Sequence, residues 1–206
     1  MARLNVNPTR MELKKLKARL TTAVRGHKLL KDKSDEMVRR FTEIIREDKR
    51  LREEVERELS LVLKQFSFAR SVTPAYEAET AFAMPTVAVK AECGVESVMG
   101  VEVPKIELFS ERRGGGLPYA YQEMTSEADY SVERAGELLP KMVKLAETEK
   151  KVRMLADEIE RNKRRVNALE YVMIPQLEET IKYIKDKLDE NERAAVVRLM
   201  KVKNKA

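Results

Sequence analysis

The stretch that decides the fold is LKKLKARLTTAVRGHKLLKDKSDEMVRRFTEI, residues 13–44, in which apolar side chains recur every three or four positions. Counted in sevens from Leu13, the pattern continues to Ala69, and no proline occurs between Arg10 and Val72. Twelve of its 17 inward positions are apolar, compared with 43% of the whole chain. A repeat of about 3.5 residues, slightly shorter than the helical turn of about 3.6, predicts a long helix in a left-handed coiled coil. The predicted seam positions are Leu13, Leu16, Leu20, Ala23, His27, Leu30, Ser34, Met37, Phe41, Ile44, Asp48, Leu51, Val55, Glu58, Val62, Gln65 and Ala69.

A second stripe of this kind runs from Leu138 to Leu188. Glu149 and Asn162 interrupt it, and an Asn in such a seam fixes register at some cost in stability. The steps lengthen around Pro175, where we expect a kink because proline removes one backbone donor and clashes with the preceding turn. The predicted seam residues are Leu138, Met142, Leu145, Val152, Leu155, Ile159, Val166, Leu169, Met173, Leu177, Ile181, Ile184 and Leu188.

The segment Asn7-Pro8-Thr9 is a predicted helix start. Thr9 is expected to cap the first turn, with Glu12 three residues later as the reciprocal half of a capping box.

The middle of the chain has a different pattern. Residues 86–91 and 98–103 are β-branched and partly alternating, with Cys93-Gly94 between them as a predicted turn. Pro104 tolerates only an edge position, and residues 106–108 are expected to extend the second strand. The pattern predicts a β-hairpin between the two helices.

These elements predict an all-α fold: a long antiparallel two-helix left-handed coiled coil with a short β-hairpin in the middle segment. The expected parts are residues 1–71 as the first helix, 72–117 as the middle segment with the hairpin, and 118–206 as the second helix. With 37% charged residues, 5% aromatic residues and no Trp, the chain suits a narrow seam with solvated outer faces better than a compact core.

Composition also suggests a compartment. The single cysteine excludes an internal disulfide and favours a reducing interior. No apolar run approaches the length of a membrane span, and the first residues carry no signal-peptide core, so we expect a cytoplasmic protein without direct membrane insertion.

Catalytic chemistry is not indicated. His27, the only histidine, falls on a seam position, where a packed or register-setting role is the simplest interpretation. Cys93 has no histidine near it in sequence. Gly114-Gly115-Gly116 leads into Leu117-Pro118 instead of the Gly-Lys-Ser/Thr that a phosphate-binding loop requires, and is expected to be a flexible connection to the second helix. We expect no catalytic residue, no cofactor and no metal site.

Charge is distributed unevenly along the chain. Residues 1–33 have a net charge of +8 and residues 193–206 a net charge of +5, whereas residues 34–192 have a net charge of −7. If the helices fold back on each other, both basic segments lie at one end. Such an end would meet nucleic acid phosphates or an acidic protein socket, but it lacks the aromatic residues and reading motif expected of a nucleic-acid interface.

Two blocks of sequence resemble a known family. Residues 7–17, NPTRMELKKLK, and 25–33, RGHKLLKDK, resemble the N-terminal helix of the D subunit of vacuolar and archaeal-type rotary ATPases. Residues 162–170, NKRRVNALE, Ile174-Pro175 and residues 180–184, TIKYI, are similar to its C-terminal helix. The middle segment resembles the family in its kind of structure, a short hairpin between long helices, more than in its individual residues.

The resemblance implies a non-catalytic central-stalk protein, the rotor axle of a V/A-type ATPase or ATP synthase. Its partners would be the catalytic A and regulatory B subunits of the head, a small companion rotor protein (the F subunit) and a funnel-shaped adaptor on the membrane ring. It would transmit torque between the nucleotide sites and proton or sodium transport, peripheral to the membrane. Expected contacts with the catalytic ring are Arg3, Arg10, Lys14, Lys15, Arg198 and Lys201, and expected hairpin contacts are Val87, Val89, Val101 and Val103.

Two other classes have related features. A prefoldin-like chaperone also places β-hairpins between coiled-coil arms, although its arms are much shorter. A coiled-coil nucleic-acid-binding scaffold would use the basic end on phosphates and bind DNA with a steep salt dependence.

Overall fold

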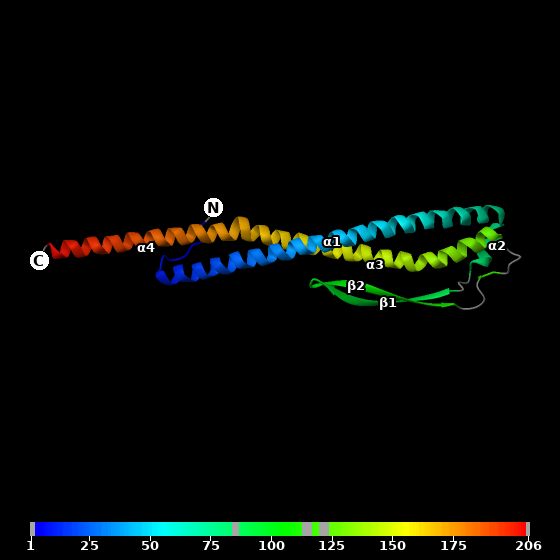
Figure 1. Ribbon diagram of the computed structural model, residues 1–206, viewed down its shortest axis with the longest axis horizontal. Helices are drawn as coiled ribbons and strands as arrows, with labels where there is room; N and C mark the ends of the chain where they lie inside the picture. The colour runs from blue at the N-terminus through cyan, green and yellow to red at the C-terminus, as the bar shows by residue number, and fades with distance from the viewer. Residues whose placement is uncertain (1–2, 84–86, 113–116, 120–123, 205–206) are drawn as a thin grey trace. The chain divides into compact units, whose positions relative to one another are not determined.

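A computed structural model describes residues 3–83, 87–112, 117–119 and 124–204. It confirms the predicted fold class (Figure 1). Along the chain, long helices come before and after a two-stranded antiparallel hairpin. The predicted glycine connection, residues 114–116, lies outside the described residues. The elements are α1 (Arg10–Val72), α2 (Ala75–Ala81), β1 (Val87–Val98), β2 (Val101–Arg112), α3 (Ser126–Ala168), the π-helix η1 (Leu169–Met173) and α4 (Ile174–Lys203).

The chain divides into two compact units. The terminal unit comprises Met1–Val38 and Ile159–Ala206, and the central unit comprises Arg39–Glu158. Helix α1 contributes its first part to the terminal unit and the rest to the central unit.

The heptad pattern of α1 is confirmed along its whole length. All 17 predicted seam positions are buried or half-buried, and every fully buried residue of α1 is one of them. Burial of this stripe is what stabilises a helix of 63 residues, whose other faces are mostly charged as far as Glu58.

The start of α1 agrees with half of the predicted capping box. The backbone N–H of Glu12 donates to Thr9 Oγ1 over 3.2 Å, so Thr9 is the cap. The reciprocal half is wrong: the N–H of Thr9 donates to the carbonyl of Asn7, and the Glu12 side chain pairs with Lys15. The turn at Pro8 therefore replaces the glutamate as the partner of the Thr9 amide.

The core of the terminal unit lies between α1 and α4. Leu16 and Ala23 of α1 form a buried cluster with Leu177 and Ile184 of α4. Contacts of Arg10 with Glu192 and of His27 with Glu170 show that the two helices are antiparallel. Further along, Asn162 is 1% exposed and its amide nitrogen lies 3.4 Å from Met37 Sδ. The Asn162 oxygen accepts from Arg165, so the buried amide has partners for both of its polar atoms.

The irregularity near Pro175 is a single turn of π-helix. Residues Leu169–Met173 form η1, and Pro175 follows within the first turn of α4. The backbone is helical at Ala168, Met173 and Ile174, so η1 is a wider turn inside a continuous helix. Met173, a predicted seam residue, is 41% exposed at the end of this wider turn, whereas Thr180, which was not predicted, is fully buried. Opposite the π-helical turn, His27 Nε2 lies 3.3 Å from Glu170 Oε2. The sequence therefore predicts the position of the helix irregularity but does not reveal the π-helical turn.

The central unit pairs α1 with α3. Val55 and Val62 of α1 and Leu138 and Leu155 of α3 are buried, and side-chain ion pairs cross between the helices. Met142 is exposed, contrary to prediction. The crossing pairs are Arg52 with Glu149, Lys141 with Glu54 and Glu58, and Lys144 with Glu47.

A small cluster lies where α1 ends. Ala69, Ala81, Tyr119 and Ala128 are buried together, and the Tyr119 hydroxyl donates to Asp129 over 2.8 Å. Burial and this carboxylate raise the pKa of Tyr119 far above its ordinary value. The sequence did not predict α2, which contributes Ala81, and it placed the start of the second helix at 118 instead of Ser126.

The hairpin is longer than predicted, and its turn lies elsewhere. Strands β1 and β2 pair from Val87 with Arg112 to Val98 with Val101, so the turn is Met99-Gly100, and Cys93-Gly94 lies inside β1. Met99 and Gly100 have φ of 54° and 83°, the left-handed pair of a type I′ turn, whose twist matches that of the strands. The predicted turn at Cys93-Gly94 is therefore wrong.

Alanine substitutions at two leucines of α4, one buried in the seam and one exposed, test how much the seam stabilises the fold. Leu177 is 1% exposed and Leu199 is 70% exposed, so Leu177→Ala is expected to lower the free energy of unfolding by about 2–5 kcal/mol and Leu199→Ala by less than about 0.5 kcal/mol. Urea unfolding followed by far-ultraviolet circular dichroism measures both. Equal losses in the two variants would show that Leu177 is not a seam residue.

Candidate partner-binding surfaces

The described residues contain no cluster of metal-binding side chains. Within residues 3–83, 87–112, 117–119 and 124–204, no group of three or more His, Cys, Asp or Glu side chains could hold a metal ion. His27 is half-buried beside Glu170, and Cys93 is exposed on β1.

The N-terminal segment turns back along α4. The N–H of Leu4 donates to Thr180 Oγ1 over 3.2 Å, and the Arg3 guanidinium lies 4.4 Å from the centre of the Tyr183 ring. Val6 packs against the core of the terminal unit. Arg3 is thus already engaged in a cation–π contact inside its own chain.

Helix α4 extends past the start of α1 in the terminal unit (Figure 1). Arg10, the first residue of α1, forms an ion pair with Glu192, and between Arg193 and Lys203 only Ala194 is even half-buried. This segment, residues 193–203, is called the α4 end below. The charge pattern of the sequence predicts both basic segments at one end. They do meet at Arg10 and Glu192, but the α4 end alone continues beyond, because the chain turns back at Pro8.

The α4 end combines positive charge with exposed apolar side chains and contains no acidic residue. Arg198 and Lys201, two predicted ring contacts, lie on it and are exposed; Lys14 and Lys15 on α1 are exposed as well. The exposed apolar residues of the α4 end were not predicted, although there are more apolar residues between positions 196 and 202 than one seam needs. The exposed apolar residues are Val196, Val197, Leu199, Met200 and Val202.

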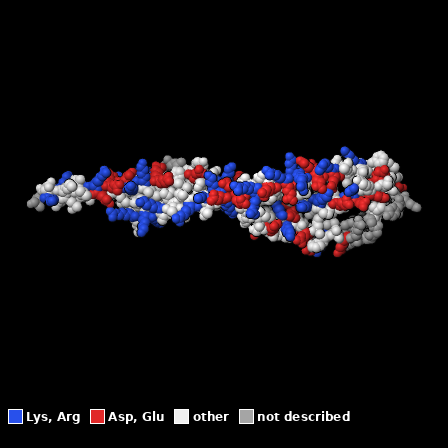
Figure 2. All heavy atoms as spheres, in the orientation of Figure 1, with Lys and Arg blue, Asp and Glu red and all other residues white. Residues whose placement is uncertain are grey.

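The terminal unit carries the positive charge of the chain. It holds 22 basic and 12 acidic side chains, a net charge of +10, whereas the central unit holds 19 and 23, a net charge of −4. Figure 2 shows Lys and Arg gathered over the first turns of α1 and mostly uncharged surface along the last turns of α4. The exposed apolar side chains of the α4 end, next to the basic side chains of the first turns of α1, suit a binding site in another protein better than a nucleic acid backbone.

The hairpin valines are not equivalent. Val89 is exposed and Val101 is half-buried, but Val103 is 1% exposed, so it is not available to a partner while the hairpin stays in place. The Val87 side chain lies outside what the structure describes. Val95, which was not predicted, is 72% exposed.

A third surface lies on the outer side of α1. Eleven of the 13 residues from Arg46 to Glu58 are charged, but only two of the 14 from Leu59 to Val72 are. The surface is hollowed beside Ser60 and Ser67, where small side chains leave room. Of the exposed apolar residues of this outer face, Leu61, Phe68 and Val72 lie on one side of the helix and Leu63 lies on the other, beside the hollow. Such a face on a two-helix unit is typical of a docking site for a further element.

None of the helices in the described ranges is long and apolar enough to cross a lipid bilayer.

Comparison with known proteins identifies the family. The family model for the ATP synthase D subunit matches residues 12–204. The chain belongs to this family. Among its relatives, the V-type ATP synthase D subunit of Clostridium novyi (strain NT) is 50% identical over 98% of this chain and 95% of its own length. Those of Thermoanaerobacter sp. (strain X514) and Streptococcus pyogenes serotype M3 (strain ATCC BAA-595 / MGAS315) are 51% and 50% identical over 98% of this chain and 97% and 99% of their own lengths.

Membership of the D-subunit family agrees with the resemblance drawn from residues 7–33 and 162–184. The match extends through the middle segment as well. It does not support the prefoldin-like chaperone or the nucleic-acid-binding scaffold.

The outer face of α1 can be tested in the isolated chain. Leu61 and Phe68 are each 58% exposed, so the double variant Leu61→Gln, Phe68→Gln should change the free energy of unfolding by less than about 1 kcal/mol, since surface changes seldom exceed about 0.5 kcal/mol each. Fluorescence of the dye ANS should fall, because the dye binds exposed apolar surface. Val62→Gln, one position from Leu61 but in the seam, is the control and should destabilise strongly. Unchanged dye binding in the double variant would contradict an accessible apolar face.

Proposed function

We propose that this chain is the non-catalytic rotor axle of a V-type rotary ATPase, peripheral to the membrane on its cytoplasmic side. The α4 end would enter the central opening of a ring of alternating catalytic A and regulatory B subunits. The observation that carries this proposal is an exposed, acid-free helix end with apolar and basic side chains in a chain that is half identical to V-type ATP synthase D subunits.

The physical mechanism is the transfer of torque through paired helices. The seam of α1 with α4 and of α1 with α3 keeps the helices from sliding, while many weak contacts at the α4 end allow it to turn in its socket. The paired helices have no threefold symmetry, so they would present a different side to each nucleotide site in the ring. In this way rotation would couple ATP hydrolysis or synthesis to proton or sodium transport.

The other two surfaces would serve the remaining partners. The outer face of α1, Leu59 to Val72, has the exposed apolar side chains that a permanent contact with the small companion rotor protein (the F subunit) or the funnel-shaped adaptor requires. The hairpin, with Val89 and Val95 exposed, offers a further contact. These assignments rest on apolar side chains that are exposed because the narrow seam cannot bury them.

Charge reversal at the basic end tests the ring contact. In the variant Lys14→Glu, Lys15→Glu, Arg198→Glu, Lys201→Glu, the net charge of the terminal unit falls from +10 to +2. Arg3 and Arg10 are left unchanged because they contact Tyr183 and Glu192 within the chain. Capture by the ring of A and B subunits should weaken roughly tenfold or more at low salt, with a smaller salt dependence, because several screened contacts are lost together.

The matched control reverses four exposed charges of the central unit: Lys49→Glu, Arg50→Glu, Lys150→Glu and Arg153→Glu. A reconstitution titration of both variants and the unaltered chain against the ring, at two salt concentrations, measures the affinities. The control should bind like the unaltered chain. Equal weakening of both variants would mean that net charge, not the basic end, determines capture. Failure of the unaltered chain to bind the ring would refute the proposed function itself.

A further inference from the structure

The hairpin has little cover of its own. Every described residue of β1 from Val89 to Ser97 is exposed, and on β2, within the described side chains, Val103 alone is fully buried. A hairpin of two strands without further support is marginally stable in water. Contacts with α3 must therefore hold these strands in place.

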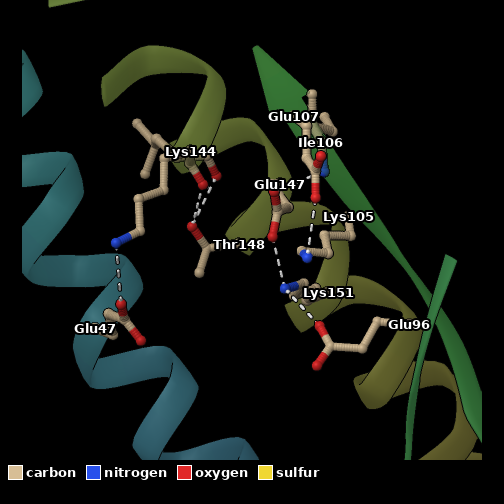
Figure 3. Close-up of polar contacts among 10 residues, drawn as sticks. Glu47, Glu96, Lys105, Ile106, Glu107, Lys144, Glu147, Thr148 and Lys151 are labelled. Atoms are coloured by element: carbon tan, nitrogen blue, oxygen red, sulfur yellow. Dashed lines mark hydrogen bonds and ion pairs between the residues drawn. The ribbon is translucent and has the colours of Figure 1, made fainter. Parts of the chain in front are cut away.

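Two charged residues of α3 make polar contacts with the hairpin. Glu147 Oε2 accepts a hydrogen bond from the backbone N–H of Ile106 on β2 over 2.9 Å. Lys151 Nζ lies 2.6 Å from Glu147 Oε1 and 3.5 Å from Oε2 of Glu96 on β1. Figure 3 shows the Glu147 and Lys151 side chains between the helix and both strands. One carboxylate and one ammonium group thus contact the two strands from a single turn of α3.

Both side chains are largely removed from water, with 16% of Glu147 and 17% of Lys151 exposed. Burial raises the pKa of Glu147, but the hydrogen bonds from Lys151 and the Ile106 N–H outweigh it, so the pKa lies below its ordinary value of 4.5. Burial lowers the pKa of Lys151, and Glu147 and Glu96 outweigh this in the opposite direction. Lys105 and Glu107 flank Ile106 on the facing strand, and they pair with each other. On the α1 side, the nearby Glu47 pairs with Lys144.

We propose that Glu147 and Lys151 form a latch that holds the β-hairpin on α3, and that the hairpin is an arm which charged side chains of a protein partner release by competing for the latch. Release would free the Ile106 N–H and expose the β2 edge, which is a surface for strand or side-chain contacts. The latch itself follows from the geometry of this chain. Its regulatory effect in an assembled ATPase rests on the function proposed above.

The direction of the pH effect follows from the lowered pKa of Glu147. A carboxylate with a depressed pKa contributes stability above its unfolded value, and that contribution is lost as the pH falls through the folded value. The latch therefore stays closed at neutral pH and opens by protonation only below about pH 4.5. In the neutral range, competition from a partner is the route of release.

The only cysteine supplies the probe. Cys93 is exposed on β1 and lies opposite Ile106 in the strand register, next to the latch. A nitroxide spin label on Cys93 of the full chain should become more mobile in the order unaltered chain, Glu147→Gln, Glu147→Ala. The Gln side chain keeps an acceptor for the Ile106 N–H but loses the charge for Lys151, whereas Ala loses both. Amide hydrogen exchange should quicken at least tenfold in β1 and β2 of Glu147→Ala and stay unchanged in α1 and α3.

Glu107→Gln is the matched control, because Glu107 is adjacent to Ile106 and contacts Lys105 on its own strand. It should leave label mobility and exchange unchanged. A Glu147→Ala variant with unaltered mobility and strand exchange would overturn the latch. Faster exchange in α1 and α3 to the same extent would also overturn it, since Glu147 would then stabilise the whole central unit.

The assembled ATPase gives the second readout. Glu147→Ala should change turnover by at least twofold relative to Glu107→Gln, with equal capture of both variants by the ring. Unchanged turnover together with a mobile label would refute regulation by the arm while the latch stands. Loss of capture in the unaltered chain would instead refute the proposed function.

Discussion

A single apolar seam, shared by two helices at a time, is the constraint on which the rest of this structure depends. A helix in a two-helix unit can bury only a narrow stripe, so most of its surface remains in water. Along α1 the buried side chains all fall on the heptad positions, from Leu16 to Ala69. The seam fixes which faces remain outside and therefore which residues can meet partners.

Polar groups within and beside the seam set the register of the helices. Asn162 is buried against Met37, and Lys141 reaches across to Glu54 and Glu58. The ion pairs are partly exposed, and each contributes little to stability. They favour one register, because a helix that slid by one turn would separate these pairs and leave the buried Asn162 amide nitrogen without its Met37 partner. For a rotor axle that transmits torque, resistance to sliding is the relevant property.

The remaining surfaces divide by chemistry. The α4 end has exposed valines and a leucine among basic residues, and the outer face of α1 from Leu59 to Val72 is almost uncharged. The hairpin contacts α3 through the largely buried charges of Glu147 and Lys151. The first two surfaces fit fixed or turning contacts with other proteins. A contact through one carboxylate and one ammonium group is different, because competing charges can break it without unfolding any helix.

The sequence by itself determined the long helices, the presence of a hairpin and membership of the D-subunit family, because these depend on periodicity and on letters close together in the chain. It did not determine the turn at Met99-Gly100, because register is fixed along both twelve-residue strands and not by the Cys93-Gly94 pair that resembles a turn. Nor did it show the π-helical turn before Pro175 or the return of Arg3 to Tyr183. Glu147 and Lys151 look like ordinary surface charges four residues apart. Only the tertiary structure brings β2 and β1 against them, because the pairing of a helix with a distant hairpin leaves no periodic signal in the chain.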